Sequence, residues 1–301
     1  MRIREALAQG SADLKFADIP SPGLDASILL AHVLRITRTE LFASGTKRIS
    51  EEACASFCEL VERRCSGECV AYLTGKKEFR ELEFTVNPSV LVPRPDTETL
   101  VEAALAISNE QGTISREQLA GNKEQLTEKN AKVVVLDLCT GSGAAAVALK
   151  NEMPELEVHA TDISEDTLEA AKSNAARLLP EKNIYFYPGD LYNALPDSLC
   201  FSLIISNPPY IPTHEIETLS PEVRNEPHIA LDGGVSGLEI IGRIIDGAPD
   251  YLHNGGALLM EADPRQMRDI AALLEKRGFN NIQLYKDLSG SERVIGGRFE
   301  K

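Results

Sequence analysis

Strand-like and helix-like patterns alternate along the chain from Val133 onward. Short apolar runs that suit buried strands are separated by alanine-rich segments with helical spacing. The runs lie near residues 133–138, 157–161, 184–187, 202–206 and 257–261. Two more runs, 281–285 and 293–296, are close enough in sequence to form a closing antiparallel hairpin. The pattern predicts a doubly wound α/β fold with a seven-stranded sheet of mixed direction.

The N-terminal quarter of the chain has a different period. Apolar residues recur at helical spacing through residues 1–75 without a clear strand, which predicts a small helical domain. Residues 76–92 change to a shorter alternation and predict a β-hairpin that links this domain to a main domain at 93–301. Within the main domain, residues 108–132 are rich in Glu, Gln, Asn and Lys, and we expect an exposed, mobile insertion there.

A glycine turn follows the apolar run at 133–138. The turn reads Cys139-Thr140-Gly141-Ser142-Gly143 and leads into an alanine-rich helix. Glycines let a backbone approach a ligand closely, and the N-terminus of the helix presents N–H groups to it. Asp162 ends the next strand, where a carboxylate can bind both hydroxyls of a ribose. The order of these features predicts a nucleoside ligand.

The glycine turn alone does not distinguish a nicotinamide cofactor from S-adenosylmethionine. Gly141, Gly143 and Ala146 also satisfy the looser dinucleotide fingerprint. Asp137, just before the turn, can pair with a cationic amino group, whereas the histidines form no recognisable acid/base motif for hydride transfer. These two observations favour the methyl donor.

A second motif, Asn207-Pro208-Pro209-Tyr210, follows the apolar run at 202–206. Two prolines have fixed φ and no N–H, so they form a stiff turn with free carbonyl acceptors. Asn207 adds an amide that donates and accepts, and Tyr210 adds an aromatic face. The turn suits a planar NH2 group such as an amide or a nucleobase amine, although an ordinary proline-rich turn after a strand would have the same sequence.

Composition narrows the classes of partner. The net charge is −15 and lysine and arginine form no run longer than Lys76-Lys77 or Arg63-Arg64, so we expect no binding of a long nucleic-acid duplex. The chain lacks an apolar run of roughly 20 residues and a signal-peptide core, which predicts a cytoplasmic protein without membrane contact. Four of the six cysteines repeat at helical spacing, and we interpret them as packing residues and predict no metal site. They are Cys54, Cys58, Cys65 and Cys69.

Three segments together carry a family resemblance. They are Leu-Val-Pro-Arg-Pro-Asp-Thr-Glu at 91–98, Asp-Leu-Cys-Thr-Gly-Ser-Gly at 137–143 and Ser-Asn-Pro-Pro-Tyr-Ile at 206–211. The series closely resembles the HemK family of protein N5-glutamine methyltransferases, which modify peptide-chain release factors. Residues 72–75, 226–234 and 236–238 extend the likeness to most of the chain. The glycine turn is common among methyltransferases, whereas the combination of Pro-Arg-Pro with Asn-Pro-Pro-Tyr is far more selective.

The resemblance implies a class I S-adenosylmethionine-dependent methyltransferase with a Rossmann-like sheet. The residues implied to bind the cofactor are Cys139, Thr140, Gly141, Ser142, Gly143, Asp162 on the ribose, Asp190 and Leu191 beside the adenine, and Asn207. The residues implied for substrate binding and catalysis are Asn207, Pro208, Pro209 and Tyr210, on which the glutamine of a Gly-Gly-Gln motif would dock. The separate periodicity and near-neutral charge of residues 1–75 suit a domain that recognises the protein substrate.

The sequence departs from the family pattern at several positions. Cys139 stands where glycine is common, Leu191 where the family carries an aromatic residue, and Ala262 where glycine often follows the acid Glu261. The segment 109–131 is also longer than expected. Two alternatives stay open: an adenine-N6 or guanine-N2 methyltransferase acting on nucleic acid, whose substrate presents the same planar NH2, and a non-catalytic binding module. The scattered basic residues disfavour the first and the intact Asn207 the second.

Overall fold

The computed structural model describes residues 1–121 and 132–300, with side chains for 1–112 and 132–300. The described chain divides into two compact units. The helical unit comprises Met1–Lys76, Val86–Pro88 and Leu219–Glu226. The sheet unit comprises Lys77–Thr85, Ser89–Thr218 and Pro227–Lys301. Val86–Pro88 and Leu219–Glu226 therefore belong to the same unit as the N-terminal helices. The helical periodicity of residues 1–75 did not predict this.

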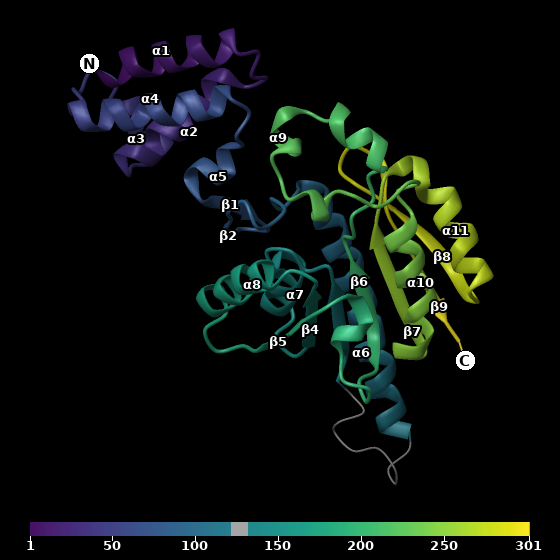
Figure 1. Cartoon of the computed structure of the whole chain (residues 1–301). Helices are drawn as coiled ribbons and strands as arrows, with labels where there is room; N and C mark the ends of the chain where they lie inside the picture. Colours follow the sequence, from purple (N-terminus) through teal and green to yellow (C-terminus); the bar gives the residue numbers. More distant parts are fainter. Residues whose placement is uncertain (122–131, 301) are drawn as a thin grey trace. The chain divides into compact units, whose positions relative to one another are not determined.

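The N-terminal part of the helical unit is a bundle of α1 (Ile3–Phe16), α2 (Pro22–Leu34), α3 (Arg38–Ala43), α4 (Glu51–Cys65) and α5 (Val70–Thr74) (Figure 1). Its core contains Leu14, Leu29, Leu30, Leu41 and Phe57, each at most 2% exposed. Hydroxyl caps start two of the helices: the Thr37 side chain accepts from the N–H of Glu40, and the Ser50 side chain accepts from that of Ala53. Such caps satisfy N–H groups that have no partner within the helix.

A buried arginine holds the segment Leu219–Glu226 within the helical unit. The Arg64 side chain is 3% exposed, and it donates to Asp25 Oδ2 over 2.8 Å and to Glu222 of α9 (Pro221–Arg224). Asn225 donates to the carbonyl of Gly67 over 3.0 Å. Gly67 has a φ of +96°, and a Cβ there would come within 2.8 Å of Pro221. Because a buried guanidinium is costly without carboxylate partners, this ion-pair cluster depends on the segment being in place.

The sheet unit is built on a seven-stranded sheet in the order β5-β4-β3-β6-β7-β9-β8. The strands are β3 (Val134–Leu138), β4 (Glu157–Asp162), β5 (Ile184–Pro188), β6 (Phe201–Ser206), β7 (Leu252–Glu261), β8 (Phe279–Lys286) and β9 (Glu292–Phe299). Strands β3 to β7 pair in parallel, and β9 pairs antiparallel with both β7 and β8. The predicted mixed sheet and closing hairpin are confirmed. A separate two-stranded sheet of β1 (Lys76–Phe79) and β2 (Leu82–Thr85) precedes it, where the sequence predicted the linking hairpin.

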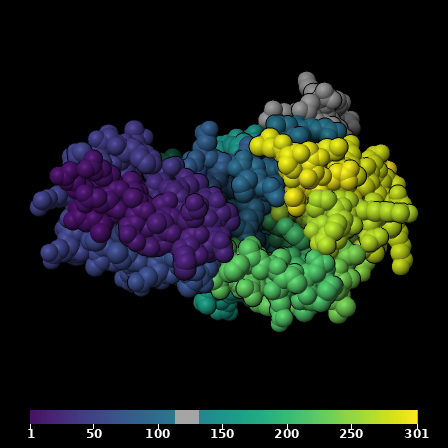
Figure 2. Space-filling model, turned by 90° about the horizontal axis from the view of Figure 1, so that it is seen from above, coloured from purple at the N-terminus to yellow at the C-terminus, as the bar shows by residue number. Residues whose placement is uncertain are grey.

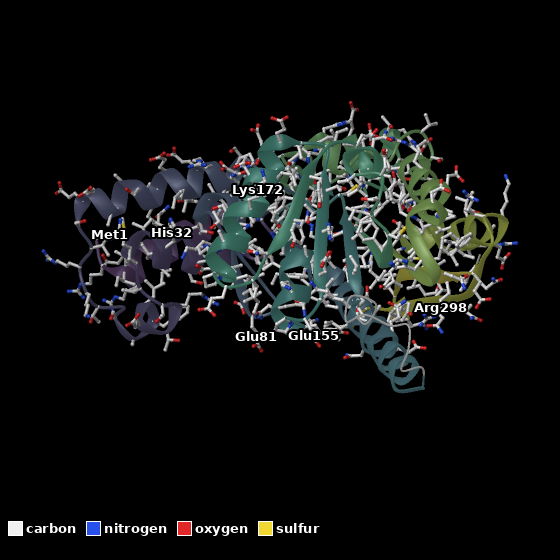
Figure 3. The ribbon with its side chains drawn as sticks, turned by 90° about the horizontal axis from the view of Figure 1, so that it is seen from below. Met1, His32, Glu81, Glu155, Lys172 and Arg298 are labelled. Carbon is white, nitrogen blue, oxygen red and sulfur yellow. The ribbon has the colours of Figure 1, made fainter. Side chains whose placement is uncertain are left out.

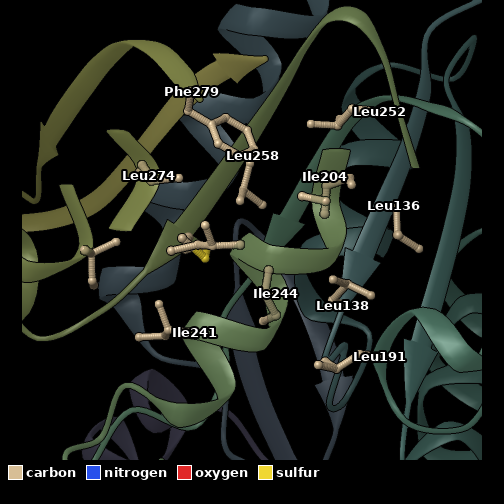
Figure 4. Close-up of a cluster of buried hydrophobic side chains, with 14 of the residues drawn as sticks. Leu136, Leu138, Leu191, Ile204, Ile241, Ile244, Leu252, Leu258, Leu274 and Phe279 are labelled. Carbon is tan, nitrogen blue, oxygen red and sulfur yellow. The ribbon is translucent and has the colours of Figure 1, made fainter. Parts of the chain in front are cut away.

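Helices cover both faces of the large sheet. They are α6 (Glu98–Gly121), α7 (Ala144–Glu152), α8 (Glu165–Leu178), α10 (Glu239–Tyr251) and α11 (Met267–Lys276), and α6 and α10 lie on opposite faces in Figure 1. Figure 4 shows Ile241 and Ile244 of α10 packed against Leu138, Ile204 and Leu258 of the strands. The closing strands and α11, yellow in Figure 2, form part of the unit's surface. Charged residues such as Glu155 and Lys172, labelled in Figure 3, are exposed.

The expectation of an exposed, mobile insertion from residue 108 is wrong for its first residues. Helix α6 continues to Gly121, and Ser108 is fully buried. Gln111 donates to the carbonyl of Ser202 on β6 over 3.0 Å, and Glu110 forms an ion pair with Arg298 of β9 at 2.6 Å. The polar composition at the start of this segment therefore belongs to a helix that packs on the sheet through its polar side chains. Residues 122–131 of the predicted insertion lie outside the described residues.

The cysteine repeat places its thiols on and after α4. Cys54 and Cys65 are partly buried, Cys58 is exposed and Cys69 is buried at the start of α5. Within the described residues, no three His, Cys, Asp or Glu side chains are grouped closely enough to hold a metal ion. Nor does any helix in that part of the chain have the length and apolar character needed to cross a membrane.

Candidate active site

A cavity of about 520 Å³ opens in the sheet unit at the carboxyl ends of the parallel strands. Open α/β sheets bind ligands at this edge, because the loops that leave neighbouring strands converge there. Most of the predicted site residues line it: Cys139, Thr140, Gly141, Ser142, Asp162, Asp190, Leu191, Asn207 and Pro209. Residues 227–230, Asp232 and Arg243 supply further parts of the wall. Gly143, Pro208 and Tyr210 are not among the lining residues.

The glycine turn is bound to the neighbouring strand by its backbone. The N–H of Thr140 donates to the carbonyl of Thr161 over 3.0 Å, and the N–H of Gly143 donates to that of Thr140 over 2.9 Å. Gly141 has a φ of +58°, and a Cβ there would meet nothing within 4 Å. Gly143 has a φ of +81° and a Cβ there would approach Ala171 of α8 to 3.2 Å. Glycine is therefore favoured at 141 by the backbone conformation, and at 143 both by the conformation and by the close packing on α8.

Two departures from the family pattern adopt left-handed backbone. Cys139 has a φ of +58° and Leu191 a φ of +51°. A residue other than glycine adopts the left-handed conformation at a cost of roughly 1–2 kcal/mol. This cost explains why glycine is common at the position of Cys139. Burial is the main cause that raises the pKa of the Cys139 thiol, so the thiol stays protonated at neutral pH. The Leu191 side chain is 8% exposed and forms an apolar part of the cavity wall.

Three carboxylates lie around the cavity in different surroundings. Asp137 is 2% exposed and accepts from the Thr140 hydroxyl over 2.6 Å, and burial raises its pKa to about 7. Asp162 accepts from the N–H groups of Gly141 and Ser164, each over 3.0 Å, and burial also raises its pKa. Asp190 is more exposed and pairs with Arg243 at 2.5 Å. A cationic ligand group near Asp137 and a hydroxyl pair near Asp162 would offset the cost of burying these charges.

The Asn-Pro-Pro-Tyr turn leaves β6 at the edge of the cavity. Asn207 donates from Nδ2 to Thr97 Oγ1 over 3.1 Å, and Tyr210 donates from its hydroxyl to Glu261 Oε1 over 3.4 Å. The Tyr210 carbonyl accepts from Gln266 over 2.9 Å, and the ring packs on the central hydrophobic core. Tyr210 is partly buried, because its ring packs against the central core. Asn207 and Pro209 are the members of the turn that line the cavity.

Sequence reasoning missed three residues of this site. Thr97 lies in η1 (Pro95–Thr97), within the segment 91–98 that carries part of the family resemblance, and it was given no role in the site. Glu261 ends β7 and was noted only for the residue that follows it. Thr161 lines the cavity, and its buried hydroxyl finds no hydrogen-bond partner among the described residues. With the carboxylates of Asp137 and Asp162, this unsatisfied hydroxyl fits a polar nucleoside cofactor such as S-adenosylmethionine.

Comparison with known proteins identifies the family of the chain. Residues 5–75 match the PrmC N-terminal domain, and residues 109–224 match the methyltransferase small domain. A release factor glutamine methyltransferase of Deinococcus radiodurans is 38% identical over 99% of both chains. One of Koribacter versatilis is 35% identical over 99% of both chains. A methyltransferase structure from Pyrococcus furiosus covers 80% of this chain and 98% of its own at a TM-score of 0.50 and 18% identity, which shows a shared fold. The chain therefore belongs to the family of release factor glutamine methyltransferases.

Proposed function

We propose that the protein transfers a methyl group from S-adenosylmethionine to the side-chain amide nitrogen, N5, of the glutamine in the Gly-Gly-Gln motif of peptide-chain release factors. The observation that carries the proposal is the position of Asn207 on the wall of the cavity that Cys139 to Ser142 also line. Asn207, which would bind the amide of the substrate, and the glycine turn, which would bind the nucleoside, line one cavity. The full-length identity to release factor glutamine methyltransferases supports the same substrate.

The glutamine amide that accepts the methyl group must be positioned accurately by the site. An amide nitrogen is a weak nucleophile because its lone pair is delocalised into the carbonyl. The bound cofactor supplies an electrophilic methyl carbon on a sulfonium centre. Alignment of the nitrogen with that carbon is then the main source of rate acceleration. Asn207 Oδ1 and the Pro208 carbonyl would accept the two N–H bonds of the glutamine, which orients the lone pair and localises charge on nitrogen.

The cofactor would be held by the residues that ring the other end of the cavity. The glycine turn and the first residues of α7, Ala144 and Ala145, line this end of the cavity, and Asp162 would accept from the ribose hydroxyls. Asp137 would pair with the amino group of the methionine part, and Asp190 and Leu191 would lie beside the adenine. Because Asp162 already accepts two backbone N–H groups, the loop and the ribose contact would be oriented by the same carboxylate.

The affinity for the cofactor is expected to depend on pH through Asp137. Its pKa in the free protein is about 7, and only the ionised form attracts a cationic amino group. Affinity should be constant above that pKa and fall as the pH drops below it, by up to about tenfold per pH unit. Calorimetry over a pH range of about 5.5 to 8.5, which spans the pKa, measures this change in affinity. In Asp137→Asn the affinity should be low and independent of pH, and an unchanged slope in this variant would contradict the assignment.

We further propose that the helical unit recognises the release factor and does not contribute to cofactor affinity. Two of its aromatic side chains are strongly exposed, Phe16 at 93% and Phe42 at 60%. The double variant Phe16→Ala with Phe42→Ala should raise KM for the intact release factor by about tenfold, the equivalent of about 1.4 kcal/mol, and leave methylation of a short glutamine peptide unchanged. Leu288→Ala removes an exposed apolar side chain of the sheet unit and is the control. Equal KM values for all three proteins would refute this division of labour.

A nucleic-acid substrate is the competing function. Transfer of labelled methyl groups from S-adenosylmethionine to a purified release factor, to duplex DNA and to ribosomal RNA separates the two. We expect label in the release factor alone, because the net charge of −15 opposes binding to a phosphate backbone. Label in DNA or RNA at a comparable rate would favour the amine of a nucleobase as the acceptor.

A further inference from the structure

Four side chains form a hydrogen-bonded chain behind the Asn-Pro-Pro-Tyr turn. Asn207 Nδ2 donates to Thr97 Oγ1 over 3.1 Å, and the side chains of Thr97 and Tyr210 both hydrogen-bond to Glu261. Thr97 is 5% exposed and Glu261 is 1% exposed. Strands β6 and β7 are parallel neighbours with Ser206 opposite Met260, so Asn207 and Glu261 leave the same edge of the sheet at adjacent positions.

Thr97 has a single hydroxyl proton, which fixes the donor and the acceptor in each of its two hydrogen bonds. An ionised carboxylate only accepts hydrogen bonds, so Thr97 donates to Glu261 and accepts from Asn207. The NH2 of Asn207 is thereby turned toward Thr97. Its Oδ1 is then the amide atom left for the cavity, which Asn207 lines. The opposite orientation would present the Asn207 NH2 to the NH2 of a glutamine, and two donors cannot bond to each other.

We propose that Thr97 and Glu261 are positioning residues that fix the orientation of the Asn207 amide and so make its oxygen the acceptor for the substrate. The inference rests on the proposed function, since the orientation matters only if an amide N–H docks on Asn207. Neither residue needs to touch the transferred methyl group. Their effect on the reaction passes through the side chain of Asn207.

The surroundings of Glu261 make the direction of these hydrogen bonds depend on pH. Oε2 of this carboxyl is buried and finds no hydrogen-bond partner in the described part of the chain. Burial raises the pKa of Glu261 to about 7, opposed by Thr97, Arg293 and Tyr210, while Asp96 raises it further. Arg293 of β9 pairs with Asp96 at 3.2 Å and with Asp287 at 3.4 Å, so its charge is shared. A protonated Glu261 can donate as well as accept, which removes the constraint on Thr97 and Asn207.

Threonine variants test the hydroxyl. Thr97→Val keeps the shape of the side chain and removes the hydroxyl, whereas Thr97→Ser keeps the hydroxyl and is the matched control. With saturating cofactor and a Gly-Gly-Gln peptide, kcat should fall by about tenfold to a hundredfold in Thr97→Val, while cofactor affinity and thermal stability stay close to those of the parent. Thr97→Ser should retain most of the parent kcat. A parent kcat in Thr97→Val, or an equal loss in both variants, would overturn the proposal.

The pH profile of kcat separates positioning from a structural role. In the parent, kcat at saturating cofactor should fall as the pH drops below the pKa of Glu261, and this fall should disappear in Glu261→Gln, whose carboxamide does not titrate. A profile that persists in Glu261→Gln would also overturn the proposal. Failure of the underlying function is distinguishable, because the parent itself would then leave the peptide unmethylated, whereas failure of this inference leaves an active parent and equally active variants.

Discussion

Asn207→Ala is expected to lower kcat for a Gly-Gly-Gln peptide by at least about a hundredfold, the usual cost of losing one positioned hydrogen-bonding group. Asn207 follows the buried strand β6, lies on the cavity wall and has its NH2 bound to Thr97. Truncation removes the acceptor from a nitrogen whose reactivity depends on alignment. The fold and cofactor affinity should change little, because the side chain lies beyond the strand. Steady-state kinetics and calorimetry measure the two effects separately.

Two further variants sharpen this result. Asn280→Ala removes an exposed asparagine on β8 of the same unit and should leave kcat unchanged. Asn207→Asp keeps an acceptor but adds a negative charge near the sulfonium, which should strengthen cofactor binding and stabilise the ground state. If Asn207→Ala and Asn207→Asp both methylated the peptide at the parent rate, the Asn-Pro-Pro-Tyr turn would be purely structural.

Asp162→Ala is expected to weaken S-adenosylmethionine binding by about 1.5–3 kcal/mol, or roughly tenfold to 150-fold, the range for a hydrogen bond to a charged group. The carboxylate accepts from the N–H groups of Gly141 and Ser164, so its loss also loosens the loop that faces the ligand. Asp162→Asn keeps the shape and removes the charge, and should have an intermediate effect. Calorimetry gives the dissociation constants directly.

The control for Asp162 is another carboxylate four residues along the chain. Asp166 is exposed at the start of α8, and Asp166→Ala should bind the cofactor as the parent does. Tight binding by Asp162→Ala would show that the ribose is held elsewhere. Weak binding by both variants would instead indicate a general electrostatic effect of the acidic surface.

The sheet followed from the sequence because its signals are local. Each parallel strand is a short apolar run bounded by turn residues, and the closing hairpin is separated by few residues. The end of α6 could not be predicted from the sequence. Gln111 packs through a hydrogen bond and Glu110 through an ion pair, and composition does not reveal these contacts. The same reason explains why Leu219–Glu226 was not assigned to the helical unit, where Arg64 and Glu222 are remote in sequence.

The proposed cofactor side of the cavity was easier to predict from the sequence than the proposed acceptor side. The glycine turn and Asp162 belong to one strand–helix–strand unit, so their spacing in the sequence reflects their spacing in the fold. The proposed acceptor side combines η1, the end of β6 and the end of β7. The sheet order makes β6 and β7 neighbours, and the hydrogen bond from Asn207 to Thr97 joins η1 to them. Thr97 and Glu261 were missed for this reason. Tyr210 was expected to offer an aromatic face, and the packing of its ring against the core was not visible in the sequence.

Methylation of the glutamine in the Gly-Gly-Gln motif can be tested by identifying the methylated atom. The purified protein, S-adenosylmethionine and a release factor are incubated together, and tandem mass spectrometry of the digested release factor locates the modification. We expect one added methyl group on the side-chain amide of the glutamine in the Gly-Gly-Gln motif, and none in a release factor whose motif glutamine is replaced by asparagine. A methyl group on another residue, or equal labelling of the substituted release factor, would contradict it.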